Sequence, residues 1–345
     1  MNTRIGGVLR QNWVRPFGTL LFVLVLATVF SPYRVLDPAD ATGWDRILSR
    51  VFFLSPGGVP IFLQGANLAN ILQQISVIAV IATGMTLVVI SGGIDLSVGS
   101  LLALSGTIFA HTLSDRQWPL PAAILAALAA TSLFGFASGV IIARLRMQPF
   151  IVTLAAMIGS RGFARWLVDN ANIDIGFGDS PVSRVVMFIA QKTVLVPTFI
   201  VVALIGYVLL RLTRFGRYLY AVGGSEVAAR LTGIQVNWVK IRVYTFCGLL
   251  AGIAGIMHCC ENHQGNPNAG VAYELDAIAA AVIGGTSLAG GKGSIFGTMV
   301  GALALGILSN LLGLNNVDEN VQFMLKAVII VIAVWLQLVG VKRDT

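Results

Sequence analysis

Residues 51–114 form a stretch of 64 positions that contains a single charged side chain, Asp95. A run of about 20 apolar residues is long enough to cross a bilayer as a helix, so this stretch alone has room for more than one crossing. Over the whole chain of 345 residues only 11% are charged and 56% are hydrophobic, whereas a soluble domain is about 25% charged. We therefore predict an all-α polytopic integral membrane protein that is surrounded by lipid.

Ten apolar segments are separated by joints that hold the Pro, Asn, Asp and Arg residues typical of loops. We expect about ten transmembrane helices, some of them broken by glycine, in a single domain that covers residues 1–345. The longest joint, 32–67, is rich in Pro and Gly. The segments are 17–31, 68–91, 94–113, 121–143, 150–168, 197–212, 241–260, 276–289, 295–313 and 321–340.

The basic residues predict an orientation rather than a nucleic-acid partner. The net charge is +8, but the Lys and Arg side chains are spread between apolar segments instead of gathering on one polar domain. With the N-terminus inside, 14 of the 23 Lys and Arg residues fall in inside loops and 6 in outside loops, as the positive-inside rule requires. This bias predicts that both termini are cytoplasmic and that the segment 32–67 is external.

The most polar of the inside loops, residues 211–242, contains a candidate short helix. Ser225 is placed as an N-cap, and Gly233 is placed as the glycine that ends a helix. Glu226 and Arg230 are four residues apart and can pair on one face. Two interpretations remain open: the helix is a docking knob for a cytoplasmic partner, or it is an ordinary interfacial helix lying on the membrane.

Asp95 follows the pair Gly92-Gly93, and glycine accepts backbone angles that other residues avoid. We expect a helix break there, with the next helix starting at about Ile94–Leu96 and leaving free N–H groups. The Asp95 carboxylate can accept from the N–H of Ser97 or Val98. In a first hypothesis, Asp95 only caps the helix. In a second hypothesis, the helix break also lies beside the solute path and moves during the transport cycle.

A second glycine-rich stretch, "SLAGGKGS" at 287–294, superficially resembles a phosphate loop. The pattern needs Gly at position 286 and Ser or Thr at position 293, and the chain has Thr286 and Gly293. ATP binding of that kind is not expected. Close helix packing and the lining of a pathway by a broken helix both remain open for Gly284, Gly285, Thr286, Gly290 and Gly291.

The segment 258–263, "HCCENH", holds metal-ligand types, but adjacent cysteines on a helix point about 100° apart. We expect neither a metal site nor a cofactor there, and no catalytic set is supported in the chain. Arg161 and Arg165 are one helical turn apart. Either their side chains snorkel, or they face inward toward a polar solute.

Four long motifs of this chain occur in the order of a known family. They are "TGMTLVVISGGIDLSVGSLLALSG" at 83–106, "PFIVTLAAMIGSRGFA" at 149–164, "VGGSEVAARLTGI" at 222–234 and "YELDAIAAAVIGGTSLAGGKGSIFGTMVGA" at 273–302. Together they resemble the bacterial ATP-binding cassette sugar permeases of the ribose/galactose/xylose type. The resemblance covers roughly residues 65–340.

The resemblance implies a permease of the bacterial inner membrane that imports a monosaccharide by alternating access. Two permease copies or paralogues would form the pathway, an external binding protein would deliver the sugar, and a cytoplasmic ATPase would hydrolyse the ATP. The ATPase would dock around Gly223, Gly224, Ser225, Glu226, Ala229, Arg230 and Gly233. The residues themselves, apart from the resemblance, leave open a pathway role for the helix breaks at Gly92, Gly93, Asp95 and Ser97 and at Gly284, Gly285, Thr286, Gly290 and Gly291.

Other substrates and another transporter class remain as alternatives. A related permease for nucleosides, amino acids or a signalling sugar would share this architecture. An ion-coupled carrier would place ionisable relay residues inside its spans, and here the span interiors are almost empty of them.

Overall fold

The structure, a computed structural model, describes residues 2–34, 59–179, 181–318, 320–329 and 331. Most of the predicted external segment 32–67 and the end of the predicted last span 321–340 lie outside the described residues.

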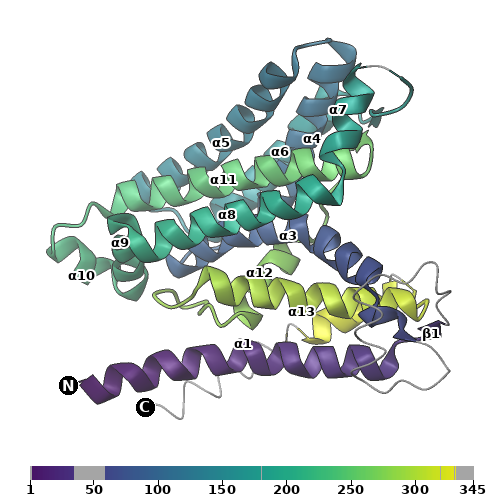
Figure 1. The fold of residues 1–345 in the computed structure, drawn as a ribbon. Helices are drawn as coiled ribbons and strands as arrows, with labels where there is room; N and C mark the ends of the chain where they lie inside the picture. Colours follow the sequence, from purple (N-terminus) through teal and green to yellow (C-terminus); the bar gives the residue numbers. More distant parts are fainter. Residues whose placement is uncertain (1, 35–58, 180, 319, 330, 332–345) are drawn as a thin grey trace.

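The described chain is mainly helical (Figure 1). Two short antiparallel pairs join β1 (Tyr33–Arg34) to β2 (Val59–Pro60) and β3 (Ile173–Asp174) to β4 (Gln264–Gly265), and short 3-10 and π turns occupy Ile61–Leu63 and His111–Asp115. The helices are α1 (Asn2–Phe30), α3 (Gly65–Ile90), α4 (Val98–Ala110), α5 (Leu120–Arg144), α6 (Pro149–Leu167), α7 (Pro181–Ile189), α8 (Lys192–Leu212), α9 (Arg214–Gly224), α10 (Glu226–Leu231), α11 (Val236–Glu261), α12 (Tyr273–Ile283) and α13 (Ile295–Leu314).

Within the described residues, five helices are long and apolar enough to cross a membrane by length and composition: α3, α5, α8, α11 and α13. Shorter apolar helices occupy Pro16–Phe30 and Asn320–Ile329. The predicted all-α polytopic fold with broken helices is confirmed. The predicted segments 94–113 and 276–289 appear as the shorter helices α4 and α12, because the glycine-rich stretches beside them adopt non-helical backbone angles.

Helix α11 packs against α3, α4 and α5. Glycines in α5 allow main chain to meet main chain there: a Cβ added at Gly135 would lie 2.3 Å from the Tyr244 carbonyl oxygen, and one at Gly139 would lie 2.8 Å from the Ile241 Cα. Small residues at such contacts are the usual means of close helix packing in membranes.

Burial separates the inner helices from those that face the surroundings. The apolar window of α3 is 83% buried, and that of α8 is 22% buried. Helix α3 therefore forms the centre of the molecule, and α8 exposes most of its apolar surface. Helix α1 lies along one flank and packs against α13 (Figure 1).

The N-terminus of α1 and the segment α9–α10 lie at the same end of the molecule, and α7 and β1 lie at the opposite end (Figure 1). The sequence places the first group inside by its basic residues and the second group outside. The fold thus gathers each predicted group of loops at one end.

Candidate functional site

Helix α10 has the cap and the ion pair that the sequence predicts. The Ser225 Oγ accepts a hydrogen bond from the Ala228 N–H at 3.2 Å, and Gly233 has the left-handed φ of +81°. The Arg230 Nη2 lies 2.7 Å from the Glu226 Oε1. These contacts hold a six-residue helix that is too short to be stable alone.

A second cation fixes α10 to the next long helix. The Lys240 Nζ lies 2.6 Å from the other Glu226 carboxylate oxygen. Partial burial raises the pKa of Glu226, but the hydrogen bonds and charges of Lys240 and Arg230 outweigh it and leave the pKa below its ordinary value. The carboxylate therefore stays ionised near neutral pH. Sequence reasoning missed Lys240, because the contact depends on how the turn before α11 folds.

The outward face of α10 consists of apolar side chains other than Ala229. Ala229 was assigned to the docking surface, yet its side chain is 3% exposed and packs inward. The side chains that project are Val227, 70% exposed, and Leu231, 84% exposed. They are four residues apart and form an exposed apolar pair beside the Glu226–Arg230 ion pair.

The break after α3 lies where the sequence predicts it. Helix α3 ends at Ile90, and Gly92 has a φ of +80°. The next helix begins at Val98, later than the predicted Ile94–Leu96, because Asp95 first closes a turn of its own. The Asp95 Oδ1 accepts from the Ser97 N–H at 2.9 Å and from the Ser97 hydroxyl at 2.6 Å.

Two side chains of α11 face this turn, and sequence reasoning missed both. Tyr244 and Cys247 interact electrostatically with the fully buried Asp95 carboxyl. A Cβ added at Gly93 would lie 2.2 Å from the Tyr244 hydroxyl oxygen, so a larger residue there would displace the Tyr244 side chain. Among the described residues, the Asp95 Oδ2 and the Tyr244 hydroxyl have no hydrogen-bond partner. A buried polar atom without a hydrogen-bond partner lowers the stability of the folded protein. We therefore treat this turn as a candidate functional position.

The loop between α12 and α13 contains three glycines with left-handed backbone angles, Gly285, Gly290 and Gly291. The Gly291 N–H donates to the Ile90 carbonyl at 2.9 Å. The Tyr220 hydroxyl of α9 donates to the Gly293 carbonyl at 2.7 Å. The loop is therefore bonded both to the end of α3 and to the helix that leads to α10.

The predicted docking and pathway glycines meet at one point, which we call the glycine junction: Ile90, Gly92, Gly223, Gly224, Gly290 and Gly291. A Cβ added at Gly223 would lie 1.8 Å from the Ile90 carbonyl oxygen and 2.6 Å from the Gly291 nitrogen. A Cβ at Gly290 would lie 3.0 Å from the Gly92 Cα. The two groups were predicted separately, and the fold brings them into main-chain contact.

The other predicted pathway residues lie around the junction. A Cβ at Gly284 would lie 2.3 Å from the Gly297 carbonyl oxygen of α13, so Gly284 allows α12 and α13 to pack closely. Thr286 is fully buried beneath Gly293.

The residues considered for metal binding and for solute contact pack against neighbouring segments of the protein. His258 packs edge-on against Tyr273 with ring centroids 5.8 Å apart, and Cys259 and Cys260 are buried thiols. Arg161 donates to the Pro267 and Ala269 carbonyls. Arg165 donates to the Asn268 side chain at 2.8 Å. Both arginines therefore hold the turn before α12 rather than snorkelling.

A family model described as "Branched-chain amino acid transport system / permease component" matches residues 67–334. The chain belongs to this permease family. The four motifs and every residue of the glycine junction lie inside the matched range, and the family predicted from the motifs is confirmed. The permease is a multi-pass transport component, not an enzyme.

Several curated relatives are similar to this permease. The ribose import permease protein RbsC of Escherichia coli K12 is 47% identical over 279 residues, which cover 80% of this chain and 86% of the relative. The ribose import permease of Bacillus subtilis is 41% identical over 280 residues, with the same coverage. The xylose transport system permease protein XylH of Haemophilus influenzae is 34% identical over 344 residues, which cover 82% of this chain and 91% of the relative.

Proposed function

We propose that this permease is the membrane subunit of an ATP-driven importer that moves ribose into the bacterial cytoplasm. Three curated relatives named as ribose import permeases share 47%, 43% and 41% of their residues with it. Two named as xylose permeases share 34% and 31%. The higher likeness to the ribose group supports ribose as the solute.

The glycine junction is the observation that carries a coupled transport mechanism. A cytoplasmic ATPase would dock on the exposed Val227 and Leu231 of α10, beside the Glu226–Arg230 pair. Helix α10 follows α9 directly at Ser225, and Gly223 touches Ile90 and Gly291 through main-chain atoms. A displacement of α10 would therefore reach the break after α3 and the α12–α13 loop without an intervening flexible side chain.

The remaining partners follow from this function. An external binding protein would deliver the sugar, and a second permease copy or paralogue would complete the pathway. Both termini would be cytoplasmic, on the side of α10. Relatives in this family are named for sugars, and the family description names branched-chain amino acids, so a test must include both solute classes.

Ribose should drive uptake by the reconstituted permease, ATPase and binding protein, and the Glu226→Ala/Arg230→Ala variant should lose it. The double substitution removes the ion pair beside the exposed face of α10, and it leaves Lys240 without its carboxylate partner. We expect the variant to insert normally and to lose about nine-tenths of ATPase co-purification and ribose uptake. This corresponds to a loss of about 1.4 kcal/mol of docking free energy, which weakens the affinity for the ATPase tenfold. Labelled-ribose uptake and co-purification measure the two effects.

The control variant is His111→Ala/Asp115→Ala, which removes another i,i+4 side-chain contact, the hydrogen bond of 2.8 Å between His111 Nδ1 and Asp115 Oδ2, just before α5. It should retain ATPase co-purification. Xylose or leucine driving uptake in place of ribose would replace the proposed solute. Uptake without ATP that a protonophore abolishes would favour an ion-coupled carrier and contradict the proposal.

Single cysteines introduced at Asp179 and Asn237 test the orientation. We expect a membrane-impermeant maleimide to label Asp179→Cys in intact cells and to label Asn237→Cys only after the membrane is opened. The native Cys247, Cys259 and Cys260 are at most 1% exposed, so they should contribute little background. The opposite labelling pattern would reverse the assignment of inside and outside.

A further inference from the structure

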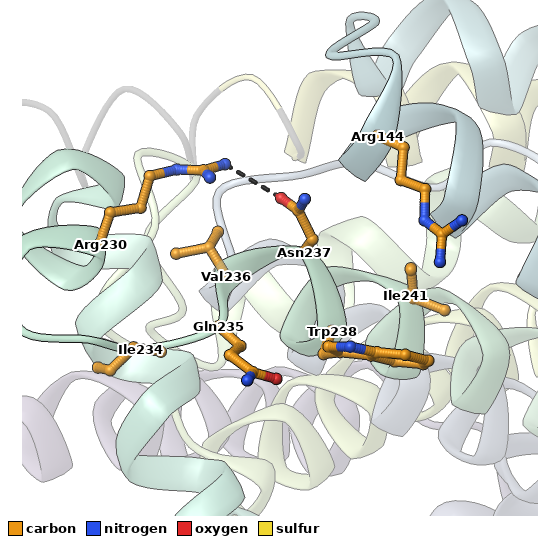
Figure 2. Close-up of a pocket in the computed structure, with 8 residues that line it drawn as sticks. All are labelled: Arg144, Arg230, Ile234, Gln235, Val236, Asn237, Trp238 and Ile241. Carbon is orange, nitrogen blue, oxygen red and sulfur yellow. Dashed lines mark hydrogen bonds between the residues drawn. The ribbon is translucent and has the colours of Figure 1, made fainter.

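A hollow of about 320 Å³, lined by both polar and apolar side chains, lies between the end of α5 and the beginning of α11. Figure 2 shows Arg144 and Arg230 on opposite sides of it, with Trp238 and Gln235 below them. Arg144 comes from the last turn of α5, and Arg230 comes from α10. Asn237, in the first turn of α11, accepts from Arg230 at 3.1 Å.

The hollow has more positive than negative charge. Arg230 is paired with Glu226 at 2.7 Å, but no acidic side chain lies within ion-pair distance of Arg144 among the residues that the structure describes. The guanidinium of Arg144 is exposed and has donors in the planar arrangement that suits a phosphate group. The positive end of the α11 dipole adds to the same potential. The hollow is therefore suited to an anion.

An apolar groove of about 390 Å³ runs between α5 and α6, and it shares with the hollow the C-terminal end of α5. Its lining starts at Leu145, the residue after Arg144, and reaches Phe134 on α5, with Ile151 and Ala155 on α6. At about 1.5 Å per helical residue, the distance from Leu145 to Phe134 is about 16 Å. This is close to half of the roughly 30 Å hydrocarbon core, so the groove has the length of one leaflet.

We propose that a phospholipid with an anionic headgroup binds at this place, with its phosphate between Arg144 and Arg230 and one acyl chain in the groove. A polar, positively charged end and an apolar groove of one-leaflet length match the two parts of such a molecule. Trp238 lines the hollow and is 48% exposed, and tryptophan is enriched where membrane proteins meet the headgroups. Basic pockets between spans on the cytoplasmic side are known to take lipid headgroups.

The lining of the hollow and of the groove includes none of the residues predicted for the solute path, so the lipid proposal does not depend on ribose being the solute. Its position next to α10 gives it a consequence for coupling. Arg230 contacts both the Glu226 carboxylate and the hollow, and a bound phosphate would hold the Arg230 side chain from the membrane side. The lipid would thereby help to fix the helix that we assign to ATPase docking.

Native mass spectrometry of the purified full chain tests the proposal with dioleoyl-phosphatidylglycerol and dioleoyl-phosphatidylcholine as probes. We expect wild-type protein to retain phosphatidylglycerol in preference to phosphatidylcholine. Arg144→Gln should lower the phosphatidylglycerol affinity by about tenfold, because it removes a charge-assisted contact. Arg146→Gln is the matched control: it removes an equally exposed arginine two residues away that does not line the hollow.

The groove is tested by Ala155→Phe, which adds bulk at an exposed position without changing charge. It should weaken phosphatidylglycerol binding by at least about fivefold, since it occupies the space of the acyl chain. Equal losses in the Arg144 and Arg146 variants would show diffuse electrostatic attraction and overturn the site. Displacement of the lipid by glycerol 3-phosphate at equal concentration would show a soluble phosphate ligand. Dissociation of a permease dimer in the Ala155 variant would assign the groove to a second copy.

Discussion

Gly223→Ala should lower ribose uptake by at least about tenfold, and Gly224→Ala should leave uptake close to the wild-type rate. A Cβ on residue 223 would lie 1.8 Å from the Ile90 carbonyl oxygen, whereas nothing lies within 4 Å of a Cβ on residue 224. Both contacting groups at Gly223 belong to the main chain, so no rotamer change can relieve the overlap. The end of α9 and the end of α3 must separate by about 1 Å or more.

The expected loss can be estimated from the cost of overpacking. Inserting a methyl group into a tight contact costs about 1–3 kcal/mol, and each 1.4 kcal/mol is a factor of ten in an equilibrium. If the junction transmits movement, Gly223→Ala should lower uptake at least about tenfold, while α10 still binds the ATPase. Labelled-ribose uptake should be measured together with ATPase co-purification and the ribose-stimulated ATPase rate.

The pair of variants separates transmission from simple instability. Loss of ATPase co-purification together with a lower melting temperature in Gly223→Ala would mean that the junction is only a packing site. Equal loss of uptake in both variants would mean that the loop tolerates no alanine at either position, whatever the contact with Ile90. Wild-type uptake in Gly223→Ala would contradict the proposed relay.

The sequence is sufficient for the helical class, for the break at Gly92 and for the cap of α10. Each depends on interactions within a few residues: apolar length, the backbone freedom of glycine, and a serine oxygen three residues from its donor. The family could also be predicted, because four motifs occur along the chain in the order that the family has.

The contacts that assemble the site could not be predicted from the sequence. Lys240 reaches Glu226 across a turn, Tyr244 reaches the Asp95 turn from another helix, and Gly223 meets Ile90 across more than 100 residues of chain. Helix packing in three dimensions decides these contacts, and neither periodicity nor spacing encodes them. The inward position of Ala229 was not predictable for the same reason, since a six-residue helix has no periodic pattern long enough to show which side is covered.

Asp95→Leu should remove most of the folded permease from the membrane, whereas Asp95→Asn should preserve its folding and most of its uptake. The Asp95 Oδ1 accepts from both the Ser97 N–H and the Ser97 hydroxyl, and leucine leaves both donors buried without an acceptor. Each unsatisfied buried donor costs about 1–3 kcal/mol, which is a large part of the stability of a marginally stable protein. Asparagine keeps an oxygen at the same place.

The second oxygen of the Asp95 carboxyl gives another reason to expect that asparagine is tolerated. The Asp95 Oδ2 has no hydrogen-bond partner among the described residues, nor does the Tyr244 hydroxyl that lies against Gly93. In Asp95→Asn the new NH₂ group can take the position of that oxygen, so the substitution breaks no hydrogen bond that the described residues make with it. The substitution therefore removes a buried charge without removing the cap.

Three variants measured by detergent-solubilised yield and by ribose uptake decide between a cap and a charge. Asp95→Ala removes the acceptor without the added bulk of leucine, so a low yield in both variants points to the lost hydrogen bonds rather than to overpacking. Asparagine with normal yield and at least about half of the wild-type uptake assigns Asp95 to structure. Asparagine with normal yield and no uptake would instead give the charge a direct part in gating, because folding would be intact and only the charge would differ. Normal yield and uptake in Asp95→Leu would contradict both roles, since neither the hydrogen bonds to Ser97 nor the charge would then be needed.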